Sequence, residues 1–139
     1  MSTTPEEAKA VLARLFKDVL TDNNIDAIDE IYAEDYEFDA PALSGGGAVQ
    51  TGREAFKNRV RAFRAAIPDI SYLVDEIVSN GDIICTKFHM TGTQAGPFAG
   101  FPPVNRPVSI TGIHFTKLEN GKIKKTWAGF TNIAEALAP

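Results

Sequence analysis

The sequence is poor in the residues that form disulfides and metal sites. Its 139 residues include one cysteine, Cys85, and two histidines, His89 and His114. A single cysteine cannot form an intrachain disulfide, which predicts a reducing, cytoplasmic setting. Neither HxxxH nor HxH spacing relates the histidines, so we expect no metal ion. Nothing else in the sequence indicates a cofactor.

Long apolar runs and a basic surplus are also missing. No apolar run reaches the roughly 18 residues of a membrane-spanning helix, and the polar, acidic N-terminus is unlike a signal peptide. The formal net charge of −4 argues against nucleic acid or an anionic membrane as a partner, because both need clustered basic residues. The basic residues near Arg53 to Arg64 are interpreted as the solvated face of a helix. Gly45–Gly47 does not lead directly into a helix, which argues against a phosphate-binding loop. Length and even composition predict one domain over residues 1–139.

Three helices are predicted before residue 68. Thr4–Glu7 combines an N-cap, a first-turn proline and capping-box spacing, and apolar residues then recur at helical spacing to about Thr21. A short second helix is expected next, and its inner side is formed by Ile25, Ile28, Ile31 and Tyr32. Thr51–Glu54 repeats the capping-box spacing and predicts a third helix, whose buried stripe is Phe56, Val60 and Phe63.

Strands are predicted on both sides of the third helix. Asp35–Asp39 has the pattern of a strand that ends at Pro41, and Ser44–Gly47 that of a flexible loop. After Pro68 the period changes to alternation, with one face formed by Ile70, Tyr72, Val74 and Glu76 and the other by Ser71, Leu73, Asp75 and Ile77.

Two hairpin signals organise the C-terminal half. Asn80–Gly81 and Asn120–Gly121 are favoured two-residue turns. Together with the apolar runs they predict a curved sheet of about four strands, the last three spanning 83–93, 107–118 and 122–131. Helices first and antiparallel strands afterwards define an α+β fold, in which the helices close one face of the sheet and leave a cavity along its concave face.

The connection Thr91–Arg106, TGTQAGPFAGFPPVNR, is rich in glycine and proline, with Phe98 and Phe101 at its centre. We interpret it as a stiff lip at one end of the sheet. Its pattern G-T-x-x-G-x-F-x-G-x-P-P-x-x-R, followed by a strand that ends in an N-G-K-I turn, resembles the SnoaL-like polyketide cyclase family. That family belongs to the NTF2-like or ketosteroid-isomerase-like superfamily. The resemblance covers most of the chain and implies an NTF2-like cone, with three N-terminal helices on a curved, mostly antiparallel sheet that pairs as a homodimer.

The resemblance also shows where this chain departs from the family. Four residues after Trp127, where SnoaL-like cyclases usually carry an acid/base Asp, this sequence has Thr131. A hydroxyl cannot take an α-proton as a carboxylate can, which puts the usual aldol mechanism in doubt. Many relatives have His where this chain has Gln94, and a His before the Pro in the first strand corresponds here to Asp39.

Two residues are the candidate proton carriers. Asp39 serves as acid or base if it faces the cavity, and otherwise caps the turn beside Pro41. His114 shares a strand face with Ile110, Gly112 and Thr116, and is either a site residue or a core histidine with one hydrogen bond. His89 is expected to point outward with Lys87.

The aromatic residues suggest a small apolar or aromatic ligand. Beside the catalytic candidates, the expected substrate-binding residues are Phe16, Tyr32, Phe88, Gln94, Phe98, Phe101, Trp127 and Thr131. The favoured function is a cofactor-independent cyclase or isomerase of polyketide-like or other polycyclic carbonyl compounds. The alternative is a non-catalytic small-molecule binding protein that keeps the cavity without the family's Asp. A third hypothesis, an interaction module, requires an exposed apolar patch on the outer sheet face.

Overall fold

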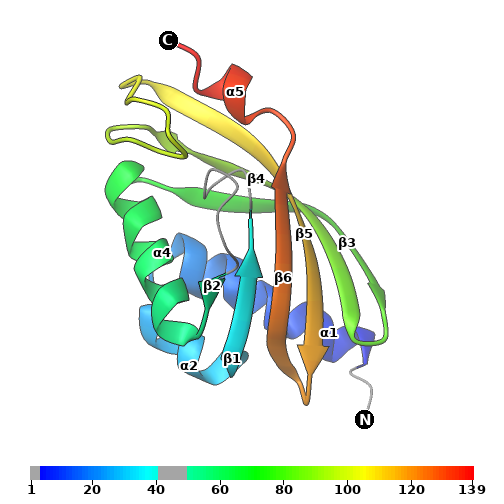
Figure 1. Ribbon diagram of the computed structural model, residues 1–139. Helices are drawn as coiled ribbons and strands as arrows, with labels where there is room; N and C mark the ends of the chain where they lie inside the picture. Colours follow the sequence, from blue (N-terminus) through cyan, green and yellow to red (C-terminus); the bar gives the residue numbers. More distant parts are fainter. Residues whose placement is uncertain (1–3, 41–49) are drawn as a thin grey trace.

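The computed structural model describes residues 4–40 and 50–139. Its strands form a six-stranded sheet in the order β2-β1-β6-β5-β4-β3, curved around the helices (Figure 1). The strand bounds are β1 (Tyr32–Asp39), β2 (Gln50–Thr51), β3 (Ser71–Asn80), β4 (Ile83–Thr93), β5 (Pro107–Glu119) and β6 (Lys122–Phe130). Among the described strands, only β1 and β6 pair in parallel. The predicted α+β fold with a curved, mostly antiparallel sheet is confirmed, and β1 and β2 extend it beyond the four expected strands.

The N-terminal helix begins as the sequence predicts. Thr4 caps α1 (Pro5–Ala13), and its Oγ1 accepts a hydrogen bond from the Glu7 amide at 3.1 Å. The helix continues as a π-helical segment, η1 (Arg14–Thr21), and ends at the predicted residue. There the Thr21 hydroxyl donates to the Phe16 carbonyl, 2.8 Å away, and so satisfies an acceptor of the last turn.

The second predicted helix is shorter than expected. It consists of one 3-10 turn, η2 (Ile25–Ala27), and α2 (Ile28–Ile31). Tyr32, expected on its inner side, is instead the first residue of β1, where its Cα pairs with Ile123. The strand therefore starts three residues before Asp35. The loop predicted at Ser44–Gly47 and the strand end at Pro41 lie outside the described residues.

The third helix, α4 (Arg53–Ala66), has a different start from the predicted one. Gly52 is the N-cap, with φ of 95°, and Thr51 belongs to β2, so the predicted capping box is wrong. Arg53 anchors the first turn instead, because its Nε and Nη2 donate to the Tyr32 carbonyl at 3.0 and 2.7 Å. A short C-terminal helix, α5 (Ile133–Ala136), follows β6.

The helices pack on the concave face of the sheet (Figure 1), and the core lies between them. Burial removes apolar surface from water at roughly 25 cal/mol per Å², which makes this layer the main source of stability. Its largest fully buried side chains are Tyr32, Tyr36, Phe88, Leu12, Leu15, Ile28, Ile67, Ile84, Met90, Ile110, Leu118 and Ile123. No described helix is long and apolar enough to cross a membrane.

Two β-bulges decide which side chains face this core. Val74 is opposite Phe88 and Glu76 is opposite Lys87, so Asp75 is an additional residue in β3. The predicted alternation holds to Val74 and then reverses, which exposes Glu76 and turns Ile77 toward the core. A second bulge lies in β6.

Candidate active site

The inner face of the sheet and α4 enclose a small apolar cavity of about 20 Å³. Phenyl rings form most of its wall. Its lining residues are Leu20, Phe38, Phe56, Arg59, Val60, Phe63, Tyr72, Phe88, His114 and Phe130. A cavity of this size holds about one water molecule, whereas pockets for drug-sized ligands measure roughly 300–1,000 Å³.

His114 lies on the cavity wall in the middle of β5. Its side chain is buried against aromatic rings, with centroids 4.6 Å from Phe88, 5.6 Å from Phe16 and 6.5 Å from Phe38. Burial lowers its pKa from 6.5 to about 4 because the charged form loses its hydration. Nδ1 has no hydrogen-bond partner within residues 4–40 and 50–139. The ring is therefore a neutral imidazole at physiological pH.

Hydroxyl groups surround His114 on the same face of the sheet. Thr86 is opposite His114, and Thr116 is opposite Thr126. All three threonines are fully buried. The hydroxyls of Thr86 and Thr116 have no hydrogen-bond partner among the described residues, whereas those of Thr126 and Tyr36 interact with each other. Sequence reasoning missed these hydroxyls because threonine is common in strands. The sequence signal that could have found them is strand alternation, which places Thr116 on the same face as His114.

Among the residues with a described position, Arg59 is the one cationic side chain that lines the cavity. Its guanidinium carbon lies 4.7 Å above the Phe38 ring and 5.9 Å from that of Phe63. Nε donates to Gln50 Oε1 at 2.9 Å. Burial lowers the pKa of Arg59, yet an arginine side chain stays protonated at any physiological pH. Sequence reasoning had placed the basic residues of this helix on a solvated face, and α4 instead turns Arg59 inward.

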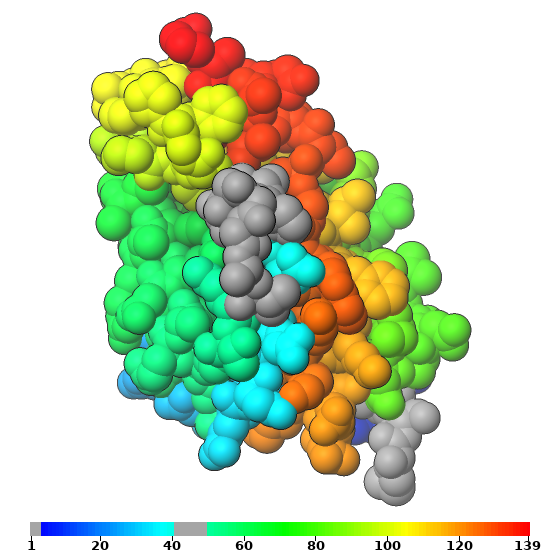
Figure 2. Space-filling model, in the orientation of Figure 1, coloured from blue at the N-terminus to red at the C-terminus, as the bar shows by residue number. Residues whose placement is uncertain are grey.

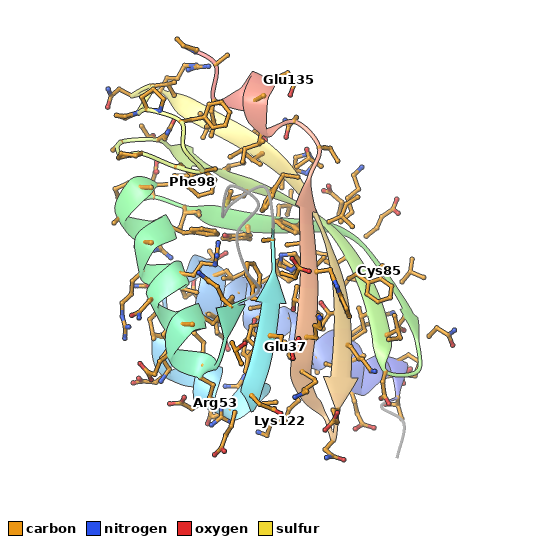
Figure 3. All side chains as sticks on the ribbon, viewed as in Figure 1. Glu37, Arg53, Cys85, Phe98, Lys122 and Glu135 are labelled. Carbon is orange, nitrogen blue, oxygen red and sulfur yellow. The ribbon has the colours of Figure 1, made fainter. Side chains whose placement is uncertain are left out.

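A surface groove of about 360 Å³ adjoins the cavity. It lies where the segment that follows β4 rests on α4, green and yellow-green in Figure 2. Arg59 and Phe63 line both spaces and separate them. Phe98 packs on Phe63 with ring centroids 5.0 Å apart, and Figure 3 shows it between the C-terminal end of α4 and the sheet. The groove is lined by Gln50, Ala55, Asn58, Arg59, Ala62, Phe63, Pro97, Phe98 and Ala99.

Three of the predicted site residues lie away from the cavity. Trp127 is 37% exposed and packs edge-on against Phe115 at 5.4 Å on the outer face of the sheet. Asp39 is paired with Trp127 across β1 and β6, whereas its neighbour Phe38 points inward. Thr131 is exposed just beyond β6. The expected inward orientation of Trp127 and Thr131 is therefore wrong, and Asp39, whose orientation the sequence left open, is not among the residues that line the cavity.

The bulge in β6 is the physical reason why the predicted orientation of Trp127 was wrong. Lys117 is opposite Lys125 but Leu118 is opposite Ile123, so Lys124 is an additional residue. If the pairing of β5 with β6 continued from the two-residue turn without a bulge, Trp127 would lie opposite His114. The extra residue shifts the register by one and turns Trp127 to the other face.

The remaining predicted ligand contacts divide between cavity, lip and core. Phe88 lines the cavity, and Phe16 packs behind it at 5.2 Å. Tyr32 lies in the core, 4.5 Å from Tyr36. Phe101 is half-buried and pairs with Phe98 through two backbone hydrogen bonds of 3.0 and 2.8 Å.

Gln94 organises the lip and is fully buried. Its Nε2 donates to the carbonyls of Gly96, Phe101 and Pro102 at 3.1 to 3.3 Å, and its Oε1 accepts from the Val104 amide at 3.3 Å. These bonds occupy the amide. Gln94 therefore fixes the shape of the segment that carries Phe98.

No carboxylate lines the cavity in the part of the chain that the structure describes. Nor do three His, Cys, Asp or Glu side chains gather there as a metal site would require. His89 lies on the outer side of β4, with Nδ1 2.6 Å from Asp75 Oδ2 at the β3 bulge. Among the described residues, the side chains with polar groups that line the cavity are thus the neutral imidazole of His114, the guanidinium of Arg59 and the phenol of Tyr72.

Comparisons with known proteins agree with this architecture. A protein described as a SnoaL-like polyketide cyclase, from Jannaschia sp. CCS1, superimposes with a TM-score of 0.84 and 20% identity, covering 100% of this chain and 99% of that one. IdmH from Streptomyces antibioticus, described as a polyketide cyclase, gives 0.77 and 24%, covering 93% and 94%.

A third structure, from Catenulispora acidiphila, has a ketosteroid-isomerase-like fold and contains trimethylamine. It gives a TM-score of 0.75 and 20% identity, covering 98% of this chain and 92% of that one. No curated protein shows significant sequence similarity to the chain. The sequence profile of the SnoaL-like polyketide cyclases, however, matches residues 10–135. This match shows that the chain belongs to the SnoaL-like polyketide cyclase family.

Proposed function

We propose that this protein is a cofactor-independent cyclase or isomerase of polyketide-like or other polycyclic carbonyl compounds, with His114 as its proton carrier. The main support is the environment of His114, a neutral imidazole in an apolar cavity with an unpartnered Nδ1. A base must be unprotonated to act, and the pKa of about 4 keeps this ring unprotonated, although the same burial makes it a weaker base than a free imidazole.

The proposed reaction needs no co-reactant. The imidazole takes a proton from a carbon beside a carbonyl, and the resulting enolate carbon attacks a second carbonyl of the same molecule. One carbon–carbon bond forms, and the imidazolium returns its proton to the new alkoxide. In an isomerisation the proton returns to a different carbon. Proton transfer by a positioned side chain contributes roughly 10²–10⁴-fold to such reactions.

A polycyclic substrate requires the cavity to widen. At about 20 Å³ the closed cavity admits no fused ring system, and the groove of about 360 Å³ lies just beyond Arg59 and Phe63. We infer that the substrate enters from the groove and displaces these two side chains. Rotation of surface-facing side chains is fast compared with typical turnover.

A binding protein is the second candidate, and one observation favours it. The residues that line the cavity include no carboxylate among those described, whereas the family resemblance led us to expect an Asp. A protein that only sequesters a flat apolar molecule needs the aromatic wall and no strong base.

Measuring whether a bound ligand is converted distinguishes the enzyme from the binding protein. A thermal-shift screen of aromatic polyketides, terpenoids and steroids identifies ligands, and their conversion is then followed by chromatography. An enzyme converts at least one ligand, and His114→Gln lowers kcat/KM by about 100-fold or more. Tight binding without conversion of any ligand would establish the binding protein instead.

We also propose that two copies pair through the outer face of the sheet. Val78, Cys85, Phe115 and Trp127 form one row across β3, β4, β5 and β6. The large apolar side chains exposed in the single chain are Leu73, Val78, Ile113, Phe115 and Trp127. Such a patch is larger than isolated surface residues explain, and the family resemblance implies pairing here.

Sedimentation tests the dimer. The wild-type protein is expected to sediment as a dimer at micromolar concentration, and Phe115→Lys, which places a charge in the patch, as a monomer. A monomeric wild type would exclude the homodimer and leave this face for a different partner, as the interaction-module hypothesis expects. Cytoplasmic location and the absence of a nucleic-acid partner stay predictions.

A further inference from the structure

Arg59 has no acidic partner, unlike Arg53 and Lys57 of α4, and unlike Arg61 and Arg64, which also bond only neutral groups, it lines the cavity. Arg53 Nη1 lies 4.0 Å from Glu34, and Lys57 Nζ lies 2.9 Å from Asp29 and 3.3 Å from Glu54. Arg59 has only the neutral Gln50 as a hydrogen-bond partner among the residues with a described position. Residues 1–3 and 41–49 contain no Asp or Glu, so an acidic partner cannot come from there either.

The surroundings of Arg59 keep its guanidinium charged and oriented. It is partly buried, and the Phe38 ring supports one side at 4.7 Å. Stacking on an aromatic ring leaves the edge of the guanidinium available for planar hydrogen bonds. Its one bond uses Nε, and Arg59 lines both the groove and the cavity. A partly desolvated cation at this junction attracts an anionic oxygen more strongly than an exposed cation does.

Both Arg59 and His114 lie against Phe38. The guanidinium carbon is 4.7 Å from the ring centroid of Phe38, and the imidazole centroid is 6.5 Å from it. A flat ligand beside Phe38 can therefore place one oxygen at Arg59 and a carbon-bound hydrogen at His114.

We propose that Arg59 is a specificity-determining residue that binds an anionic oxygen of the ligand, either a carboxylate or an enolate, at the junction between groove and cavity. The ligand oxygen then takes up the guanidinium donors that have no acidic partner, and its ring system lies against Phe38 and Phe63. Only the assignment of the enolate as a reaction intermediate rests on the proposed function. Anion recognition itself does not require turnover.

Calorimetric titration with three naphthalene probes tests this assignment. The probes are 2-naphthoate, which carries a carboxylate, 2,4-dinitro-1-naphtholate, a delocalised oxyanion that resembles an enolate, and the neutral methyl 2-naphthoate. The variants are Arg59→Gln, which removes the charge, and Arg59→Lys, which keeps it without the planar fork. The matched control is Arg61→Gln on the same helix, where the arginine is exposed and bonds Asn58 Oδ1 at 3.0 Å.

We expect at least one anion to bind the wild type about 10- to 100-fold more tightly than the ester, because charged hydrogen bonds contribute that much. Arg59→Gln abolishes this preference because it weakens binding of the anions far more than that of the ester, Arg59→Lys keeps part of the preference, and Arg61→Gln keeps all of it. A preference for naphthoate identifies a ligand carboxylate as the natural group, and one for the naphtholate identifies an enolate.

The proposal is overturned if the wild type favours neither anion, or if the preference persists in Arg59→Gln. His114→Gln is expected to retain the preference. Loss of turnover in His114→Gln with the preference intact supports both proposals. A protein that converts nothing but discriminates anions through Arg59 contradicts the proposed function alone.

Discussion

The two faces of β5 and β6 differ in a way that runs against simple hydrophobic patterning. In the middle of the two strands, the inner face, under the helices, carries Gly112, His114, Thr116, Thr126 and Ala128, and the outer face carries Ile113, Phe115, Lys117, Trp127 and Gly129. In this middle part the larger apolar side chains are on the side without helices, whereas Ile110, Leu118 and Ile123, toward the strand ends, are buried under the helices. Small and polar residues on the inner face leave room for the rings of Phe16, Phe38 and Phe88, which pack directly on His114.

We infer from this difference that the two faces of the sheet have different functions. The inner face has buried polar groups that folding alone does not need, since an unpartnered buried hydroxyl lowers stability. Of the polar side chains named above, His114 lines the cavity. The outer face has apolar area that a single chain leaves in water, which is the composition of a surface that pairs with another protein.

The strongest way to test the comparison is to truncate one phenylalanine on each face. Phe88→Ala removes a ring that is 1% exposed, and is expected to lower the free energy of unfolding by about 3–5 kcal/mol. Phe115→Ala removes a ring that is 40% exposed in the single chain, and should cost less than half as much when unfolding is measured at concentrations where the protein is monomeric. Chemical denaturation measures both values. Equal losses would show that the outer face is as well packed as the inner one.

The stability of the protein in acid should depend on the buried His114 of the inner face. Because burial lowers the pKa of His114 from 6.5 to about 4, the unfolded chain takes up this proton at a higher pH than the folded one. Its contribution to stability is complete above about pH 6.5 and is lost progressively toward pH 4, by up to about 3 kcal/mol. Denaturation at several pH values measures the slope.

His114→Gln is the control for that slope. Carboxylates with lowered pKa, such as Asp35 and Asp69, also lose stabilising interactions in acid, so only the difference between wild type and variant reports on His114. A slope unchanged by the substitution between pH 4 and 6.5 would place His114 in a hydrated environment.

Two glycines provide a matched pair with a smaller expected effect. A Cβ on Gly112 would lie 2.4 Å from the buried Phe88 ring, whereas one on Gly129 meets nothing within 4 Å. Gly112→Ala should therefore destabilise the protein by about 1–3 kcal/mol through overpacking. Gly129→Ala should leave stability equal or slightly higher. Thermal unfolding compares them, and similar melting temperatures for the two variants would contradict the assignment of faces.

The smallest effect is expected at Thr131. An Asp introduced into an apolar cavity would lower the free energy of unfolding of the protein, and its own pKa would be raised. Thr131 is exposed, so Thr131→Asp should change the free energy of unfolding by no more than about 0.5 kcal/mol. A loss of several times that size would indicate that residue 131 is buried after all.

Much of the fold could be predicted because its signals are local. The cap at Thr4 and the turns at Asn80–Gly81 and Asn120–Gly121 depend on neighbouring residues, and the helices and hairpins they define are present. The family resemblance then supplied the cone. The start of α4 was mispredicted because a glycine with φ of 95° and a contact from Arg53 to the Tyr32 carbonyl replaced the local capping box.

The site was less predictable because it depends on bulges and on tertiary packing. Strand periodicity places Trp127 and Ala128 on opposite faces of β6, but it cannot locate the extra residue Lys124. That residue reverses which of the two side chains faces inward. Arg59 looked like part of a solvated surface, because its stacking on Phe38 joins a helix to a distant strand. His114 could be identified, since its chemistry and its strand both pointed to the cavity.

The account depends most on its claim that proton transfer takes place on the inner face, at His114. The direct measurement is kcat/KM for His114→Gln and Asp39→Asn, side by side, on a carbonyl substrate that the wild type cyclises or isomerises. We predict a loss of about 100-fold or more for His114→Gln and a value close to wild type for Asp39→Asn. A large loss in Asp39→Asn with full activity in His114→Gln would contradict the account and move the chemistry to the outer face.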